Sequence, residues 1–220
     1  MERENSLSFP RTFKESYRMK NFVFDVGGVL LQNGVAQYLQ ERMTYKEDVT
    51  IVQEEIFHSV ERVQLDRGVI GKEEAFKKML CRIPERSRKE AKDLYDEYMA
   101  NRKIVCGMVE LLEKLKKKGH KLYVLSNFGV DFEEIIKKNN FQFFNLFDGV
   151  FVSSFYQTVK PEGQIFDAFL RKYGLDAEDC FFIDDKEENV EAAIYKGFSG
   201  FVFRGDVNAL EAYIKETEAA

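Results

Sequence analysis

The sequence lacks two features that would each assign it to a broad functional class. It has no uninterrupted apolar stretch long enough to span a bilayer. It also has no basic excess, since 33 lysines and arginines stand against 38 acidic residues, for a formal net charge of -5 and a pI near 5.4. A general nucleic-acid binder would show a basic face. We therefore expect neither nucleic acid nor a membrane among its partners.

Cysteine is scarce as well. The three cysteines, Cys81, Cys106 and Cys180, are odd in number and show no metal-ligand spacing. We interpret them as free thiols in a reducing compartment, which predicts a cytoplasmic protein. The first residues are polar and charged and lack the apolar segment of a secretory signal. We therefore predict that residues 1–19 form an N-terminal extension outside the active site.

What the sequence does contain is a series of short apolar runs, at residues 22–25, 121–126, 149–153, 180–184 and 200–203. Runs without polar alternation are typical of strands buried on both faces of a parallel sheet. Amphipathic helical patterns lie between or after them, at about 107–119, 131–139, 163–173, 187–196 and 206–217. Strands that alternate with helices indicate βαβ units. The predicted fold class is α/β, a doubly wound parallel sheet with a Rossmann-like core.

The segment from 33 to 103 interrupts this alternation. It shows helical patterns near 34–42, 46–62, 71–81 and 86–101 and no convincing strand. A connection of about 70 residues is too long for an ordinary loop between two strands. We therefore predict an all-helical subdomain at 33–103, inserted into a core made of residues 20–32 and 104–220.

Polar residues suited to phosphate chemistry follow four of the apolar runs: Asp25, Ser126 with Asn127, Lys160, and Asp184 with Asp185. The carboxyl ends of parallel strands open on one edge of a doubly wound sheet, so these side chains should converge. Asp25 is a candidate nucleophile or metal ligand at that edge. The glycines that follow it at 27 and 28 allow the backbone to turn sharply and to approach a bound group.

The chemistry of phosphoryl transfer requires each of these residue types, because its catalysis consists mainly of positioning and charge neutralisation. Mg²⁺ is commonly held by one or two carboxylates and by substrate oxygens. Asp25 and Asp184 can supply the carboxylates, and the backbone carbonyl of Gly27 can supply a third oxygen. Ser126 and the amide after it would hydrogen-bond the phosphoryl oxygens. Lys160 would place a positive charge on the phosphate and help keep Asp25 ionised.

Together these residues resemble the motifs of the haloacid dehalogenase-like hydrolase superfamily: motif I at Asp25, motif II at Ser126-Asn127, motif III at Lys160-Pro161, and motif IV at Asp184-Asp185 with Asn189. The helical insertion lies where type-one members carry their cap, and the Asp-x-Gly motif is most similar to a bacterial subgroup that includes sugar-phosphate phosphatases. The resemblance implies that Asp25 attacks phosphorus and forms an aspartyl phosphate. It also implies an Mg²⁺ ion held by Asp25, Gly27 and Asp184, and a phosphate bound by Ser126, Asn127 and Lys160.

Gly27 departs from the superfamily pattern, because the phosphatases normally carry there a second aspartate that acts as acid and base. General acid-base catalysis contributes on the order of 10²–10⁴-fold. A leaving group that is already a weak base departs without much protonation. We therefore expect an Mg²⁺-dependent phosphatase acting on a small phosphorylated metabolite, with sugar 1-phosphates as a candidate class. The sequence leaves open whether a cap residue, or Asp185 through a water, replaces the acid.

Three alternatives fit the same residues. A 2-haloacid dehalogenase also uses an aspartate nucleophile and lacks the second acid, but it needs no metal, whereas Asp184-Asp185 favours a metal site. A catalytically impaired relative would bind a phosphorylated ligand or a protein. A phosphotransferase such as a mutase would take its acid-base residue from elsewhere. The physiological substrate and the oligomeric state are not readable from the sequence.

Some other polar residues have simpler interpretations. Asp131 and Asp185 each precede a glutamate by three positions, which is the spacing of a capping box. We interpret Asp131 as a residue that caps a helix, and Asp185 as either a helix-capping residue or a second acid of the site. His120 lies in a turn before a strand and is expected to be exposed. Arg62 and Arg67, in the helical insertion, are weaker candidates to reach the polar part of a substrate.

Overall fold

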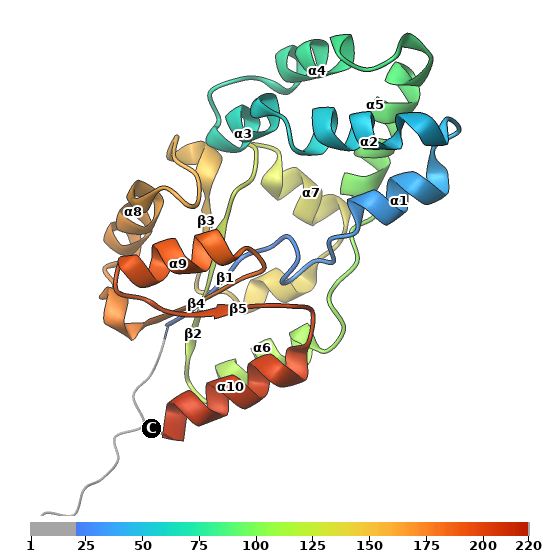
Figure 1. The fold of residues 1–220 in the computed structure, drawn as a ribbon. Coiled ribbons are helices and arrows are strands. Elements are labelled where there is room, and N and C mark those ends of the chain that lie inside the picture. Colours follow the sequence, from blue (N-terminus) through green and yellow to red (C-terminus); the bar gives the residue numbers. More distant parts are fainter. Residues whose placement is uncertain (1–20, 220) are drawn as a thin grey trace, which may run out of the picture.

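The fold is a single parallel sheet with helices on both faces and a helical segment at one end (Figure 1). The computed structural model describes residues 21–219, so the predicted N-terminal extension lies outside the described residues. The five strands are ordered β3-β2-β1-β4-β5, with β1 at Asn21–Phe24, β2 at Lys121–Ser126, β3 at Gly149–Val152, β4 at Cys180–Asp184 and β5 at Ser199–Val202. These strands lie at nearly the predicted bounds, and the predicted α/β fold class is confirmed.

The two faces of the sheet carry separate apolar clusters. Because successive side chains of a strand point to opposite faces, Val23 packs with residues of α8 (Gly163–Tyr173) and α9 (Glu187–Tyr195). Phe22 and Phe24 pack on the opposite face with residues of α6 (Met108–Lys117), α7 (Phe132–Lys138) and α10 (Val207–Ala219). With both faces covered, the ligand-binding positions of this sheet are restricted to its edge at the strand ends.

His120 belongs to the second of these clusters, and the prediction that it is exposed is wrong. Its ring is buried and meets the ring of Phe22 edge-on, with the centroids 4.9 Å apart. The lysine-rich sequence around it suggested a surface turn, but the imidazole packs against the ring of Phe22 in β1. No helix among the described residues is long and apolar enough to cross a membrane, and the cytoplasmic location stays a prediction.

The segment 33–103 is helical throughout its regular structure and contains no strand. Its elements are α1 (Val35–Arg42), a 3₁₀ turn (Lys46–Asp48), α2 (Val49–Val52), a π-helical turn (Gln53–Phe57), α3 (Val60–Arg67), α4 (Lys72–Cys81) and α5 (Glu85–Ala100). The pattern at 46–62 predicted one helix, but hydrogen bonding there changes from 3₁₀ to α to π, and the chain leaves the helix after Phe57 before α3 begins at Val60. These helices gather at the top of Figure 1, away from α6 and α10. We call this segment the cap, and its exact boundaries stay a prediction.

The cap contacts the core at the C-terminus of α3. Arg67 forms a bidentate ion pair with Glu162, with Nη1 3.0 Å from Oε2, so it does not extend toward the cavity described below. The Ser153 hydroxyl donates to the carbonyl oxygen of Asp66. Gly68 ends the helix at a left-handed φ of 75°, and a Cβ there would lie 2.3 Å from the Ser154 carbonyl oxygen. The two parts approach so closely that only glycine fits at this contact.

We predict that Gly68→Ala lowers the free energy of unfolding more than Gly174→Ala does. Both glycines end a helix at positive φ, 75° and 63°, so each variant has the left-handed conformation that costs roughly 1–2 kcal/mol. A Cβ at position 174 would meet nothing within 4 Å, so the extra loss at position 68 reports the cap–core contact. Urea unfolding followed by circular dichroism measures both. Equal losses would show that the cap can move off the core at little cost.

Candidate active site

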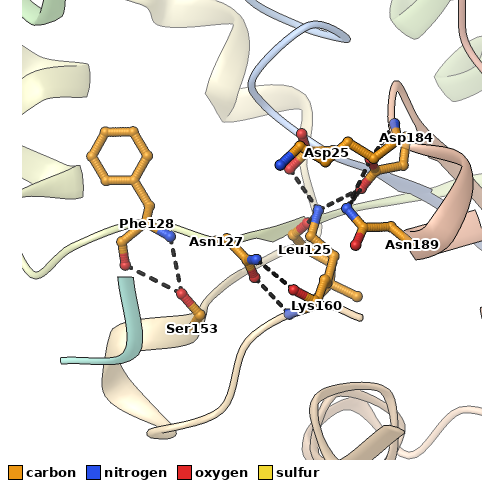
Figure 2. Close-up of polar contacts among 9 residues, drawn as sticks. Asp25, Leu125, Asn127, Phe128, Ser153, Lys160, Asp184 and Asn189 are labelled. Atoms are coloured by element: carbon orange, nitrogen blue, oxygen red, sulfur yellow. Dashed lines mark hydrogen bonds and ion pairs between the residues drawn. The ribbon is translucent and has the colours of Figure 1, made fainter. Parts of the chain in front are cut away.

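The ammonium group of Lys160 lies between two carboxylates at the strand ends (Figure 2). Its Nζ donates to Asp25 Oδ1 at 2.7 Å, to Asp184 Oδ2 at 2.6 Å and to the Leu125 carbonyl oxygen at 2.9 Å. All three of its donors are therefore used. The Lys160 side chain is 1% exposed and that of Asp184 is 0% exposed. The structure thus brings together three of the residues that the sequence singled out, from three separate parts of the chain.

The register of the sheet explains why the two aspartates are neighbours. Phe24 of β1 is paired with Ile183 of β4, and the Asp25 amide donates to the Ile183 carbonyl oxygen at 2.9 Å. The residues that follow these two strands therefore emerge side by side. Asp184 is held further by Asn189, whose Nδ2 lies 3.0 Å from Oδ1 and 3.1 Å from Oδ2.

Asn127 positions Lys160 rather than pointing a free amide at a ligand. Its Oδ1 accepts from the Lys160 backbone N–H at 2.8 Å, and its Nδ2 donates to the Lys160 carbonyl oxygen at 2.9 Å. Both ends of the amide are occupied, so a phosphate contact from residue 127 would use its backbone N–H. Ser126, at the end of β2, is buried and lines the same cavity as Asp25.

Three carboxylates come close enough to share a cation. Asp25, Asp184 and Asp185 each offer one oxygen, and these oxygens lie within 4.8 Å of one another. A set of hard oxygen donors of this kind fits Mg²⁺. The carboxylate of Asp185 lies against Gly28, where a Cβ would be 2.2 Å from Oδ2 and the φ is 80°. Gly27, whose carbonyl is the predicted third ligand, lines the same cavity.

Neither aspartate with capping-box spacing caps a helix through its side chain. The N-cap of α9 is Lys186 rather than Asp185, and no side-chain capping bond is formed there. Asp131 does occupy the N-cap position of α7, but its side chain makes no capping bond and instead lies 3.9 Å from Lys72 Nζ. Asp131 instead lies near a cation of the cap and Asp185 joins the carboxylate cluster, and sequence spacing alone reveals neither position.

Burial controls the electrostatics of this cluster. It raises the pKa of Asp25 to about 6; the attraction of Lys160 opposes the shift and the charge of Asp184 adds to it. Burial by itself would lower the pKa of Lys160, but Asp184 and Asp25 outweigh it and raise that pKa. Lys160 therefore stays protonated, and an additional cation beside Asp25 would favour its ionised form.

The site opens into a cavity of about 450 Å³ between core and cap. Asp25, Gly27, Ser126, Asn127 and Lys160 line it from the core, whereas Asp184 is buried beneath it. On the cap side the wall includes apolar and aromatic side chains, namely Phe57, Val63, Tyr98 and Met99. Arg62 also lines the cavity, as the sequence suggested, but its guanidinium is engaged by Asp66 Oδ1 at 2.6 Å and by the Tyr95 hydroxyl at 2.8 Å.

Sequence reasoning missed several charged residues of the cavity wall, among them Asp66 and Arg102. Asp66 belongs to a turn signal in the sequence, and it lies in the last turn of α3. Arg102 follows α5 in a charged stretch and has no motif around it. Only the crossing of the chain from cap back to core brings it to the cavity.

Comparison with known proteins agrees with this geometry. The sequence model of the haloacid dehalogenase-like hydrolases matches residues 19–197. The chain belongs to this family. A sesquiterpene phosphatase of Aspergillus oryzae, astK, is 27% identical over 183 residues, which are 82% of this chain and 88% of that protein. The chain is thus a member of a hydrolase family and has a phosphatase among its relatives.

Solved structures show the same fold. A family enzyme from Bacteroides thetaiotaomicron, crystallised with magnesium and inorganic phosphate, has a TM-score of 0.68 and 24% identity over 87% of this chain and 98% of its own. A dehalogenase has a TM-score of 0.62 and 19% identity over 83% of each chain. At these identities the likeness establishes the fold and does not choose between phosphatase and dehalogenase chemistry.

We predict that Lys160→Met lowers the free energy of unfolding by about 3–5 kcal/mol in EDTA, because it leaves two buried carboxylates without their cation. Mg²⁺ should raise the melting temperature of this variant more than that of the wild type, since the ion would restore positive charge beside Asp25 and Asp184. Lys89→Met, at a lysine with a 91% exposed side chain, is the control and should change neither value. If Mg²⁺ did not change the melting temperature of Lys160→Met, this result would contradict metal binding at these carboxylates.

Proposed function

We propose that the protein is an Mg²⁺-dependent phosphatase that hydrolyses a small phosphate ester through an aspartyl phosphate on Asp25. The observation that carries the proposal is the ammonium of Lys160 fixed between Asp25 and Asp184 below a cavity that the cap lines on one side. A nucleophilic carboxylate with a cation beside it and a ligand space before it is what attack on an anionic ester requires.

In this proposal Asp25, Asp184 and the Gly27 carbonyl hold Mg²⁺, with Asp185 in the same oxygen set. When bound, the ion neutralises charge on the phosphoryl oxygens. The Asp25 carboxylate attacks phosphorus. Ser126 and the backbone N–H of Asn127 hold the phosphoryl oxygens in line with that attack, and Lys160 contributes its positive charge beside Asp25.

The cap wall bears on the substrate class. Sugar phosphates were the sequence-based expectation. The cavity is small, and Phe57, Val63, Tyr98 and Met99 give its wall apolar and aromatic surface, which also suits a hydrocarbon group. The relative from Aspergillus oryzae is a sesquiterpene phosphatase. We therefore propose small organic phosphate monoesters as the class, and both sugar phosphates and short isoprenoid monophosphates belong in the screen.

We predict that the wild type releases phosphate from at least one such ester in Mg²⁺, and that EDTA or Asp25→Asn abolishes this release. The loss in Asp25→Asn follows because an amide oxygen is too weak a nucleophile to form the acyl phosphate. Asp167→Asn, at a half-exposed aspartate paired with Lys196, is the matched control and should keep full activity. Chloride release from a 2-chloro acid in EDTA would instead identify a dehalogenase.

We predict that Gly27→Asp accelerates hydrolysis of alkyl phosphates by about 10²-fold, because it supplies a general acid. A Cβ at position 27 would meet only Asp25 Oδ2, at 4.0 Å, so the side chain has room. Aryl phosphates, whose leaving groups need little protonation, should gain much less. Steady-state kinetics on both classes measure the difference. If neither the wild type nor Gly27→Asp turned over any phosphate or chloro substrate, a ligand-binding role would replace the enzymatic one.

A further inference from the structure

The absence of an acid at position 27 raises the question of what stabilises the leaving group. The space beside Gly27 is open, since a Cβ there has a single neighbour within 4 Å. A carboxylic acid at this position would donate a proton to the departing oxygen. Without one, the negative charge that develops on that oxygen must be stabilised by another donor that faces the cavity.

Among the described cations that line the cavity, Arg102 is the one with a buried and unpaired donor. Lys160 uses all its donors on Asp25, Asp184 and Leu125, and Arg62 is engaged by Asp66 and Tyr95. Lys186 also lines the cavity but is exposed to solvent. The Nε of Arg102 is buried and has no hydrogen-bond partner among the described residues.

The unpaired donor of Arg102 differs from the other orphan in the cavity wall. Asn189 Oδ1 is also buried without a partner among the described residues, but it is an acceptor and cannot stabilise an oxyanion. Buried N–H groups are nearly always hydrogen-bonded in folded proteins. Arg102 lines the ligand cavity, and we take its orphaned N–H as a position where a bound acceptor completes the bond.

Arg102 is also fixed in place. It lies where the chain returns from cap to core, and its Nη2 donates to the Gln32 carbonyl oxygen at 3.0 Å. Gln32 lies where the chain leaves the core for the cap, and its backbone N–H donates to the Lys103 carbonyl oxygen at 2.7 Å. The guanidinium lies 5.0 Å from the ring centroid of Tyr98. A donor held by both segments that connect the core to the cap, and by an aromatic ring, is preorganised, as stabilisation of transition-state charge requires.

The negative charge of Asp25 attracts the guanidinium of Arg102. Burial lowers the pKa of Arg102, while the attraction of Tyr98 and Asp25 opposes that shift. An arginine nevertheless remains protonated in proteins. No ion pair joins Arg102 to a carboxylate among the described residues, so its charge is available to a ligand bound before Asp25.

We infer that Arg102 is a catalytic residue that donates its Nε–H to the leaving oxygen of the substrate, in place of the absent acid at position 27. This inference rests on the proposed phosphatase function. An Asp25 carboxylate oxygen forms the bond to phosphorus while the bond from phosphorus to the ester oxygen breaks. The electron pair remains on that oxygen, hydrogen-bonded to Arg102, and water protonates the alkoxide as it leaves. Arg102 itself loses no proton.

The test compares leaving groups. kcat/KM for p-nitrophenyl phosphate, phenyl phosphate and an alkyl phosphate is measured in Mg²⁺ for the wild type and Arg102→Met. Because kcat/KM covers the steps through formation of the phospho-enzyme, the variant should lose on the order of 10²–10³-fold with the alkyl ester and at least tenfold less with the p-nitrophenyl ester. Arg42→Met removes a cap arginine that is half exposed and lies over Tyr38, outside the cavity wall, and should leave all three values unchanged.

A second variant separates this role from a structural one. In the double variant Gly27→Asp/Arg102→Met, the new acid should restore most of the alkyl-ester rate and little of the aryl-ester rate. An equal loss for every leaving group, or no restoration by Gly27→Asp, would overturn the inference. If Arg102→Met does not fold, Arg102→Lys keeps the positive charge but displaces the donor, and it should show the same leaving-group dependence in weaker form.

A binding measurement distinguishes failure of this inference from failure of the proposed function. Orthovanadate in its five-coordinate form carries an oxygen where the leaving oxygen would lie. Calorimetry in Mg²⁺ should show vanadate binding at least tenfold weaker in Arg102→Met than in the wild type, with inorganic phosphate binding changed less. Equal vanadate affinity in both would overturn the role of Arg102 alone. A wild type that neither binds vanadate nor releases phosphate would overturn the phosphatase and this inference together.

Discussion

The buried contact of Lys160 with Asp25 and Asp184 is the constraint on which the rest of the site depends. Three charged groups removed from water are tolerable only when each is paired and hydrogen-bonded. Here the ammonium has three acceptors, and Asn189 Nδ2 donates to the carboxylate of Asp184. This arrangement forms only if β1 and β4 are neighbours in the observed register and if Asn127 holds the backbone of Lys160. The sheet therefore builds the site through its strand order rather than through any single loop.

The cap forms one wall of the cavity above the residues at the strand ends. Its apolar wall and its contact at Gly68, Arg67 and Ser153 close a space above the carboxylates. The cap shields part of this space from water, and where the dielectric is lower each charge acts more strongly on a bound anion. The same shielding explains why a single unpaired N–H of Arg102 can matter, because an acceptor in bulk water would gain little from it.

Much of this architecture is encoded locally. Apolar runs of four to six residues predicted the strands, because a parallel strand buried on both faces appears in the sequence as a continuous apolar run. The polar residues that follow these runs marked one edge of the sheet. The sequence pattern alone therefore predicted that Asp25, Lys160 and Asp184 lie together. Residues whose environment depends on distant segments were predicted poorly: His120 packs against the ring of Phe22 in β1, and the side chain of Asp131 lies near Lys72 and does not cap its helix. The sequence pattern did not indicate Arg102 at all, because its position depends on the path of the two segments that connect the core to the cap.

The balance of charge in the cavity floor also bears on the chemistry. Asp25, Asp184 and Asp185 are three carboxylates, and Lys160 is the one ammonium in contact with them among the described residues. Such a floor would repel a phosphate dianion, so it cannot bind one productively without a further cation. In the proposed function, a divalent ion shared by these oxygens would remove the excess negative charge, and the charges of Lys160 and Arg102 would then attract the ester. Burial and the charge of Asp184 raise the pKa of Asp185, so ionisation of all three carboxylates together is unfavourable unless a cation occupies the cluster.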